Sequence, residues 1–509
     1  MSNVENNKRI AKNTLYLYFR MAFSMVVSLY SSRLILDILG ADDYGIYNVV
    51  GGFATSFFFL SSTLSNATQR YFNYEKGLGE KKELNKLFNM VLIIYLCFSI
   101  FSIITIETVG LWLIHNKLTI SPDRLDAAVW VLHTTSFTLL FTLISSVYES
   151  VLISNENMRI YAYMGIYDAI SKLLILFPLF FLTIDKLKIY AILLVIVIAI
   201  GKMVPTIYTI KKYDETRLRF YWNKKTVIDI FKFSGWNLIG TSVYIFNDYG
   251  INILLNLFFG PAINAARAIS VNVKNIVVYF TSSYFTAVRP QIVKSYANKD
   301  YNYYTSLIIN TSKYSFFLLW IICLPIMCNI NVLLDFWLKD VPFMTSEFVI
   351  WTLIFVLVNS FCDPLWQGMQ AIGTLKKYIL VGSIIYLLTF PFTWIALDIW
   401  HLPIHAFQII VLIRIVYLIS NFIIFKTYVN LSIKRYLHSV IQPVIIVVVS
   451  STMITMLIKN TIIVNSFVST AFIISMELIT TLSIVFFAGI SRDERVTVAE
   501  AIKNKLCRY

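Results

Sequence analysis

The segment Leu39–Val50, LGADDYGIYNVV, contains two adjacent aspartates, Asp42 and Asp43, between two glycines in the middle of apolar sequence. Three interpretations are open for it: a metal-binding turn, a catalytic carboxylate pair, or a hinge between two membrane spans. Two neighbouring aspartates without further nearby ligands do not make a cage for a metal ion. Because glycines permit a tight reversal of the chain, we favour the hinge if the flanking runs are spans.

The composition of the chain indicates a membrane protein. Its 509 residues are 58% hydrophobic and 14% charged, with a mean hydropathy of +0.71, which is too apolar for a soluble multidomain protein. The net charge of +15 would suit nucleic acid only if the basic residues clustered on a soluble face. They lie between apolar runs instead, so we expect no nucleic-acid partner.

Sequence motifs for catalysis or metal binding are missing. The five cysteines form no CxxC pair and the five histidines are scattered, so we predict neither a disulfide framework nor a zinc site. The sequence contains no HExxH, GxSxG or P-loop pattern. We therefore expect no enzyme activity, no catalytic residues, no metal and no cofactor.

Apolar runs recur along the whole chain. A helix needs about 20 residues to cross the hydrocarbon core, and runs of that length predict an all-α integral membrane protein with about fourteen spans. The expected centres of these spans are Val26, Phe58, Phe101, Thr138, Ile175, Val195, Tyr244, Val277, Trp320, Leu357, Leu387, Val416, Val449 and Ile474.

The distribution of basic residues tests the number of spans, because cytosolic segments of membrane proteins are enriched in lysine and arginine. With a cytosolic N-terminus, the predicted inner segments hold roughly four times as many basic residues as the outer ones. We therefore expect both termini in the cytosol. The segment Leu39–Val50 then falls at the first outer turn, where acids are tolerated.

The two halves of the chain align weakly with each other. Gly40 falls on Gly260, and Arg70 falls next to Arg289. The period covers six spans, an even number, which predicts a parallel repeat about an axis along the membrane normal. We expect a cytosolic tail (1–13), a six-helix bundle (14–210), a basic cytosolic linker (211–235), a second six-helix bundle (236–430), two additional transmembrane helices (431–490) and a cytosolic C-terminal tail (491–509). The linker suits either an amphipathic helix on the inner leaflet or a solvated connection.

Polar residues inside the predicted spans follow helical spacing. A charge near the bilayer centre costs at least about 2.5 kcal/mol, so such residues mark function or a structural ion pair. The stripes on spans 1, 4, 7, 8 and 10 should line a shared, hydrated cavity between the halves. Asp168 and Lys172 lie four residues apart and could simply neutralise each other. Lys202 and Lys313, near inner span ends, are expected to snorkel to the headgroups.

Four segments together resemble a known family. They are SSRLILDILGADDYGIYNVVGG, SNATQRYFNYEKG, FKFSGWNLIGTSVYIFNDYGINILLNLFFGPAINAARAI and VRPQIVKSYANKD. They are similar to Wzx-type polysaccharide or O-antigen flippases of the multidrug/oligosaccharidyl-lipid/polysaccharide (MOP) exporter superfamily. The resemblance covers nearly the whole chain. It implies a MATE-like fold of two six-helix bundles, with a central cavity that opens alternately to each side, plus two C-terminal helices.

The resemblance also implies a substrate and a location. The substrate is an undecaprenyl-diphosphate-linked oligosaccharide, moved across the bacterial cytoplasmic (inner) membrane for surface polysaccharide assembly. Membrane lipids, a polysaccharide polymerase and other assembly proteins are the expected partners. A diphosphate needs cations in a low-dielectric cavity, and sugars need hydrogen-bonding groups. We expect Arg20, Arg267, Lys274, Asn237, Tyr244 and Asn252 to bind the substrate; Asp248, Glu149 and Asp363 are hypothesised to couple H+ or Na+.

Two other functions remain open from the sequence. A cation-coupled multidrug exporter of the same superfamily should have a net acidic cavity, whereas three of the expected cavity residues are basic: Arg20, Arg267 and Lys274. A membrane polysaccharide polymerase would need a sizeable outer loop for its catalytic site. The longest outer segment, around NKLTISPDRLD, is short.

Overall fold

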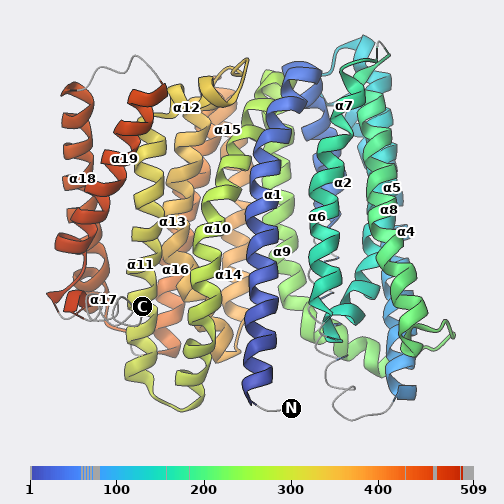
Figure 1. Ribbon diagram of the computed structural model, residues 1–509, viewed down its shortest axis with the longest axis horizontal. Helices are drawn as coiled ribbons and strands as arrows, with labels where there is room; N and C mark the ends of the chain where they lie inside the picture. The colour runs from blue at the N-terminus through green and yellow to red at the C-terminus, as the bar shows by residue number, and fades with distance from the viewer. Residues whose placement is uncertain are drawn as a thin grey trace. The chain divides into compact units, whose positions relative to one another are not determined.

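The computed structural model describes residues 3–58, 81–155, 157–182, 184–429, 431–461, 467–492 and 494–496, together with positions 61, 65, 68 and 72. All regular elements in these ranges are helical (Figure 1). The chain forms two compact units. The first comprises Met1–Ile269, Leu338–Phe343 and Phe390–Ala406, and the second comprises Ser270–Trp337, Met344–Thr389 and Phe407–Tyr509.

Long helices make up most of the first unit, joined by short helical turns. In chain order they are α1 (Asn3–Ile46), η1 (Tyr47–Gly51), α2 (Gly52–Thr55), η2 (Ser56–Phe58), α4 (Lys81–Asn116), η3 (Pro122–Arg124), α5 (Leu125–Ser154), α6 (Met158–Leu174), α7 (Leu176–Leu179), α8 (Lys186–Lys212), η4 (Asp214–Thr216), α9 (Lys224–Phe259) and the beginning of α10 (Pro261–Ala297). Most of α15 (Thr389–Trp400) also belongs to this unit.

The second unit contains the rest of α10 and the helices that follow it. They are α11 (Tyr301–Cys328), α12 (Ile330–Trp337), α13 (Thr345–Ile372), α14 (Lys376–Leu387), most of α16 (Ile404–Tyr428), α17 (Ile433–Tyr436), η5 (Leu437–Ile441), α18 (Gln442–Thr461), α19 (Phe467–Ile484) and η6 (Val485–Gly489).

Nine helical stretches of the described chain are long and apolar enough to cross a membrane, which establishes a multi-pass membrane protein. They contain nine of the fourteen expected span centres; those at Val26, Phe58, Ile175, Tyr244 and Val277 lie outside them. Val26, Tyr244 and Val277 lie in α1, α9 and α10, which are 44, 36 and 37 residues long. These three helices carry three of the five predicted polar stripes, those on spans 1, 7 and 8; the stripes on spans 4 and 10 lie in stretches that are apolar enough. The count of fourteen therefore stays a prediction.

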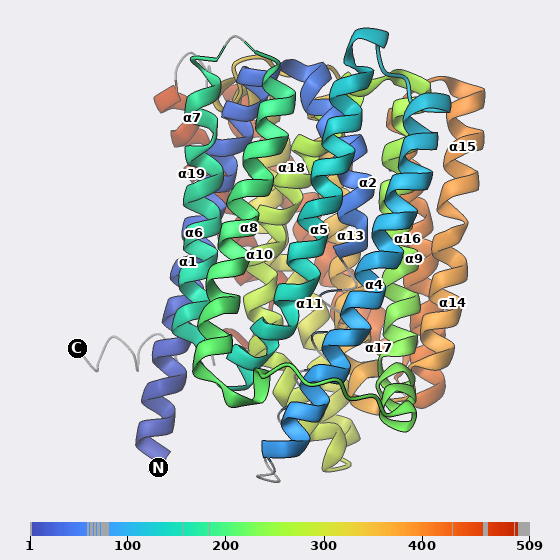
Figure 2. The same cartoon turned by 90° about the vertical axis from the view of Figure 1, so that its right-hand side faces the viewer.

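Helix α5 packs closely against two long helices of the first unit. It packs against α4 on one side and α8 on the other (Figure 2). A Cβ atom at Gly110 of α4 would lie 2.6 Å from the side chain of Leu132, so a larger residue there would displace that side chain. The buried hydroxyls of Ser136, Ser146 and Ser150 donate to carbonyls of their own helix, at 3.0, 2.7 and 2.9 Å. Small residues at helix contacts are typical of membrane packing.

The two glycines that align in the predicted repeat share an unusual backbone conformation. Gly40 has φ 77° and ψ 172°, and Gly260 has φ 80°. No atom lies within 4 Å of a Cβ added at either position, so conformation rather than space requires glycine there. Gly45 is needed for the opposite reason, since its Cβ would lie 1.8 Å from the carbonyl oxygen of Pro261. The first outer turn therefore packs directly on the start of α10.

The end of α1 is held by one arginine, which answers the question raised by the paired aspartates. Arg124 donates to both carboxylate oxygens of Asp43, at 2.8 and 2.5 Å, and to both oxygens of Asp185, at 3.0 and 3.1 Å. Asp185 also accepts the amides of Leu187 and Lys188 and so caps α8. Burial raises the pKa of Asp43. Burial would also raise the pKa of Asp185, but the bonds from Arg124 and the Lys188 amide lower it.

Four polar contacts attach the hairpin α18–α19 and the segment after it to α11, beside which both helices lie (Figure 1). The buried ammonium of Lys313 contacts both carboxylate oxygens of Glu494 at 2.7 Å, whereas the sequence predicts that it snorkels to the headgroups. The other three contacts are Trp320 Nε1 to Ser451 Oγ at 2.8 Å, Asn329 Nδ2 to Glu477 Oε2 at 2.7 Å, and Lys459 Nζ to the carbonyl of Cys328. The hairpin is therefore bonded along the length of α11.

We predict that Gly40→Ala and Gly260→Ala each lower the free energy of unfolding by about 1–2 kcal/mol, because a side chain is strained in these backbone conformations. The control is Gly235→Ala in α9, where the added Cβ also meets nothing within 4 Å and φ is not positive. That variant should be neutral or slightly stabilising. Thermal unfolding of the purified protein measures the stability of all three variants. An equal loss of stability in all three would contradict the conformational explanation.

We predict that Arg124→Met lowers the free energy of unfolding by about 2–3 kcal/mol, because it leaves two partly buried carboxylates unpaired. Arg217→Met is the control: Arg217 and its partner Asp214 are 69% and 72% exposed, so its loss should cost about 0–1 kcal/mol. The free energy of unfolding of Arg124→Met should differ most from that of the wild type at neutral pH. The difference should shrink as Asp43 and then Asp185 become protonated, below about pH 4 for Asp185. A difference that does not change with pH would exclude the carboxylates as the cause.

Candidate functional site

Two of the expected site residues form an ion pair between α9 and α10. The Nη2 atom of Arg267 donates to Oδ1 of Asp248 at 2.8 Å and to its carbonyl oxygen at 2.9 Å. The Arg267 side chain is 7% exposed, whereas that of Asp248 is 36% exposed. The expected phosphate ligand and the expected coupling acid therefore neutralise each other in this conformation.

Asn252, expected to bind sugar, lies in a buried network of asparagines. Its Nδ2 donates to the carbonyl of Asn48 at 3.1 Å, and its Oδ1 accepts from Asn264 Nδ2 at 2.8 Å. Asn256 donates to Asn264 Oδ1 at 3.1 Å and accepts the Thr119 amide at 2.8 Å. The network ties the beginning of η1 to α9 and α10. Its hydrogen bonds satisfy both polar atoms of the Asn252 side chain within the protein.

The structure does not test whether the other four expected substrate-binding residues form one site. Arg20 and Asn237 lie in α1 and α9, but their side chains are outside the described part of the structure. Tyr244 is 38% exposed on α9. Lys274 is half-buried in the part of α10 that belongs to the second unit. Their roles stay predictions.

Glu149, one of the proposed coupling acids, is paired with a lysine. Lys202 Nζ of α8 lies 2.7 Å from Glu149 Oε1 of α5, with side chains 27% and 16% exposed. Lys202 had been expected to reach the headgroups; the carboxylate attracts its ammonium inward instead. Nearby on α6, Lys172 Nζ lies 2.9 Å from Asp168 Oδ2, which is the neutralising pair that the spacing allowed.

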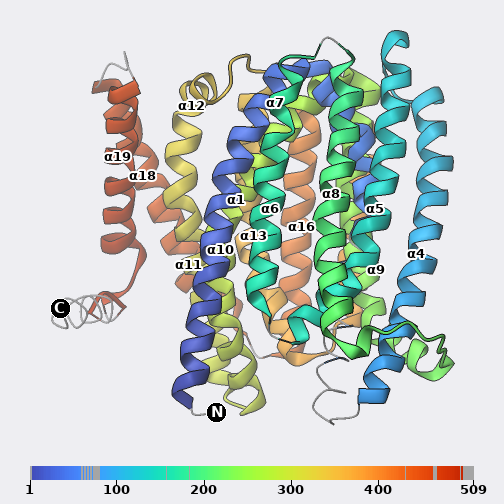
Figure 3. The ribbon, with the colours of Figure 1, turned by 45° about the vertical axis from the view of Figure 1, so that its right-hand side comes forward.

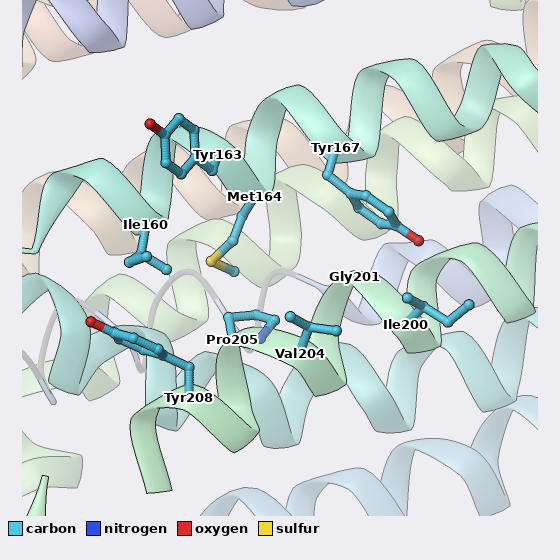
Figure 4. A pocket seen from close by; sticks show the side chains of 9 residues that line it. All are labelled: Ile160, Tyr163, Met164, Tyr167, Ile200, Gly201, Val204, Pro205 and Tyr208. Carbon is cyan, nitrogen blue, oxygen red and sulfur yellow. The ribbon is translucent and has the colours of Figure 1, made fainter. Parts of the chain in front are cut away.

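These two ion pairs line one cavity of about 290 Å³ between α5, α6 and α8, which we call the α5–α6–α8 cavity. An apolar groove of about 290 Å³ adjoins it between α6 and α8, two helices that lie side by side (Figure 3). Figure 4 shows Met164 of α6 pointing toward Val204 and Pro205 of α8 across this groove. Met164, Tyr167 and Gly201 line both spaces.

Asp363, the third proposed coupling acid, belongs to a separate cluster in the second unit. Its Oδ2 accepts from Asn359 Nδ2 at 2.9 Å, and Asn359 Oδ1 accepts from Arg414 Nη2. The buried guanidinium of Arg414 lies over the rings of Tyr417 and Tyr386, at 4.5 and 5.4 Å from their centroids. An asparagine thus bridges a carboxylate and an arginine between α13 and α16.

Sequence reasoning did not single out Asn264 or assign Lys202 to a site. A signal for Asn264 was present, since it lies three residues before Arg267, on the same helix face. No comparable signal linked Lys202 to Glu149, because their pairing depends on how α5 packs against α8. Among the described residues, no group of three or more histidines, cysteines or acids could hold a metal ion.

Comparison with solved structures identifies the fold of the chain. No protein-family model and no curated protein matches the chain. Among solved structures, the lipid II flippase MurJ in an inward closed conformation matches 93% of this chain and 99% of its own, with a TM-score of 0.71 at 17% identity. The chain has the fold of MurJ.

The same fold extends to multidrug transporters. An inward-facing MATE family transporter of the MOP superfamily matches 79% of this chain and 98% of its own, with a TM-score of 0.63 at 14% identity. The structure of a mutant of the Vibrio cholerae MATE transporter VcmN matches 83% of this chain and 96% of its own, with a TM-score of 0.57 at 15% identity. The expected MATE-like, all-helical membrane fold is confirmed. Solved structures that share this fold include a lipid flippase and two MATE transporters.

We predict that Arg267→Met lowers the free energy of unfolding by about 2–3 kcal/mol, because it leaves Asp248 without its cation. The double variant Arg267→Met/Asp248→Leu should recover most of this loss, since both charges are then gone. Thermal unfolding of the wild type, both single variants and the double variant gives the coupling energy. Additive losses would mean that the two charges do not depend on each other.

Proposed function

We propose that this protein is a Wzx-type flippase that moves an undecaprenyl-diphosphate-linked oligosaccharide across the bacterial cytoplasmic membrane. The observation that carries the proposal is the match to the lipid II flippase MurJ, which extends over 93% of this chain and 99% of that one. The loose motifs in the first outer turn and in VRPQIVKSYANKD support the narrower assignment to O-antigen or capsule assembly.

The proposed transport mechanism is alternating access. It uses fourteen spans in two six-helix bundles of the same orientation, two C-terminal helices and cytosolic termini. The positive-φ glycines at equivalent turns, Gly40 and Gly260, support the parallel repeat. A polysaccharide polymerase and other assembly proteins would take up the translocated unit.

The Arg267–Asp248 pair suggests how substrate binding is coupled to an ion. The guanidinium of Arg267 can exchange the carboxylate for a substrate phosphate, since arginine binds both in similar geometry. Asp248, left without its cation, would then take up H+ or Na+ to avoid an unpaired charge. Arg20 and Lys274 are proposed as further phosphate ligands, and Asn237, Tyr244 and Asn252 as sugar ligands. Glu149 and Asp363 remain candidates for ion coupling.

A cation-coupled multidrug exporter is the second candidate, because the MATE transporter match has a TM-score of 0.63. A cationic drug would be repelled by Arg20, Arg267 and Lys274 if these residues line the transport path. A strain carrying the protein should therefore gain no resistance to cationic dyes. Resistance gained from the wild type but not from Asp248→Asn would favour the exporter.

We predict that Arg20→Ala, Arg267→Ala and Lys274→Ala each reduce surface polysaccharide about tenfold or more, because each loses one charge-assisted phosphate contact. The measurement is complementation in a strain whose surface polysaccharide depends on this protein, with membrane expression checked for each variant. Lipid-linked repeat units should accumulate on the cytosolic side. Arg217→Ala, which removes an exposed surface charge, is the control. Normal polymer from all three site variants would refute the assignment of these cations.

A further inference from the structure

The α5–α6–α8 cavity contains two ion pairs and several other polar and aromatic side chains, and none of the expected substrate-binding residues whose side chains the structure describes lines it. It has both polar and apolar walls, a volume of about 290 Å³ and an open side, and it is lined by three helices and Phe58. This volume is at the small end of ligand pockets, about 300–1,000 Å³. The cavity therefore suits one small chemical group rather than a long chain or a large drug.

The charges in this cavity balance. Glu149 is paired with Lys202 at 2.7 Å, and Asp168 with Lys172 at 2.9 Å. An entering group with a single charge would take one partner of the half-buried Glu149–Lys202 pair and leave the other unpaired, which is costly. The Asp168–Lys172 pair is more exposed, so separating its charges costs less. The cavity thus disfavours both a diphosphate and a cationic drug.

An uncharged group with several hydroxyls can bind in this cavity without separating the charges of either ion pair. Each hydroxyl can donate one hydrogen bond and accept two, so neighbouring hydroxyls can bond to a carboxylate and an ammonium at once. The ion pairs then remain together. Thr142 adds a hydroxyl to the lining, while Phe58 and Tyr167 add aromatic rings, as is usual in pockets that combine apolar walls with a few polar groups.

The ring of Tyr167 packs directly against a glycine of α8. A Cβ atom at Gly201 of α8 would lie 2.8 Å from Tyr167 Cε1, so any larger residue displaces the ring. The Tyr167 hydroxyl donates to the carbonyl of Val197 at 3.3 Å. Gly201 therefore leaves room for this ring, and the bond to Val197 holds its hydroxyl, where the cavity meets the apolar groove.

We propose that the α5–α6–α8 cavity is a binding site for an uncharged sugar unit, with its hydroxyls on the Glu149–Lys202 and Asp168–Lys172 pairs and its ring beside Tyr167. The proposal rests on the proposed function, in which that sugar is part of the lipid-linked oligosaccharide. It makes the cavity a specificity site that prefers neutral over charged sugars.

The test is thermal unfolding of the full-length protein in a detergent without sugar groups, with glucose, N-acetylglucosamine, glucuronate or glucosamine added. Glucose or N-acetylglucosamine should raise the Tm of the wild type in a saturable way, and glucuronate and glucosamine should not. Two variants probe the site independently: Lys202→Met breaks an ion pair, and Gly201→Ala displaces the ring with both pairs intact. Each should need about tenfold more sugar for the same shift. Lys188→Met, which breaks the Asp126 pair outside the cavity, should behave as wild type.

Three results would overturn the proposal. They are no saturable shift in the wild type, equal shifts in wild type and both cavity variants, and shifts of equal size with charged and neutral sugars. Sugars also stabilise proteins by exclusion from the surface, but that effect is equal in all variants and therefore belongs to the second result. Failure of the proposed function is separable: sugar binding would persist in vitro, while the wild type would not restore surface polysaccharide in the complementation strain.

Discussion

A charge inside a bilayer has no water to solvate it, and the arrangement of polar groups in this protein follows from that constraint. Glu149, Asp248 and Lys313 each have an oppositely charged partner on another element within 4 Å. In the part of the chain that the structure describes, Asp363 has no such partner at that distance, and Asn359 bonds both to it and to Arg414. The helices are thus held together by complementary charges as well as by packing.

Such pairing gives the candidate site its chemical character. In the proposed mechanism the Asp248 carboxylate competes with a substrate phosphate for Arg267, so binding is an exchange of partners. The balanced α5–α6–α8 cavity applies the same principle to uncharged groups, which can be bound and released without separating a pair.

The sequence predicted the elements much better than their contacts. Apolar runs and positive-inside bias depend on local composition, so the helical membrane fold and the reversal at Gly40 were accessible. The partner of Asp43 was not, because Arg124 lies far along the chain and reaches it only after α1, α5 and α8 have packed. Lys202 and Lys313 were expected to snorkel for the same reason: snorkelling is a property of one helix, whereas pairing with Glu149 or Glu494 requires a second element. Asn252 shows that a polar stripe cannot distinguish a cavity wall from a buried hydrogen-bonded seam.

The attachment of α18 and α19 to α11 has a consequence for biosynthesis. Lys313, Trp320 and Asn329 enter the membrane with α11, several helices before Glu494, Ser451 and Glu477 are made. Until then these side chains lack the partners that they have in the finished protein. The second unit is therefore completed only when the last helices arrive, and a chain that stops early leaves these polar groups without the partners that they have in the finished protein.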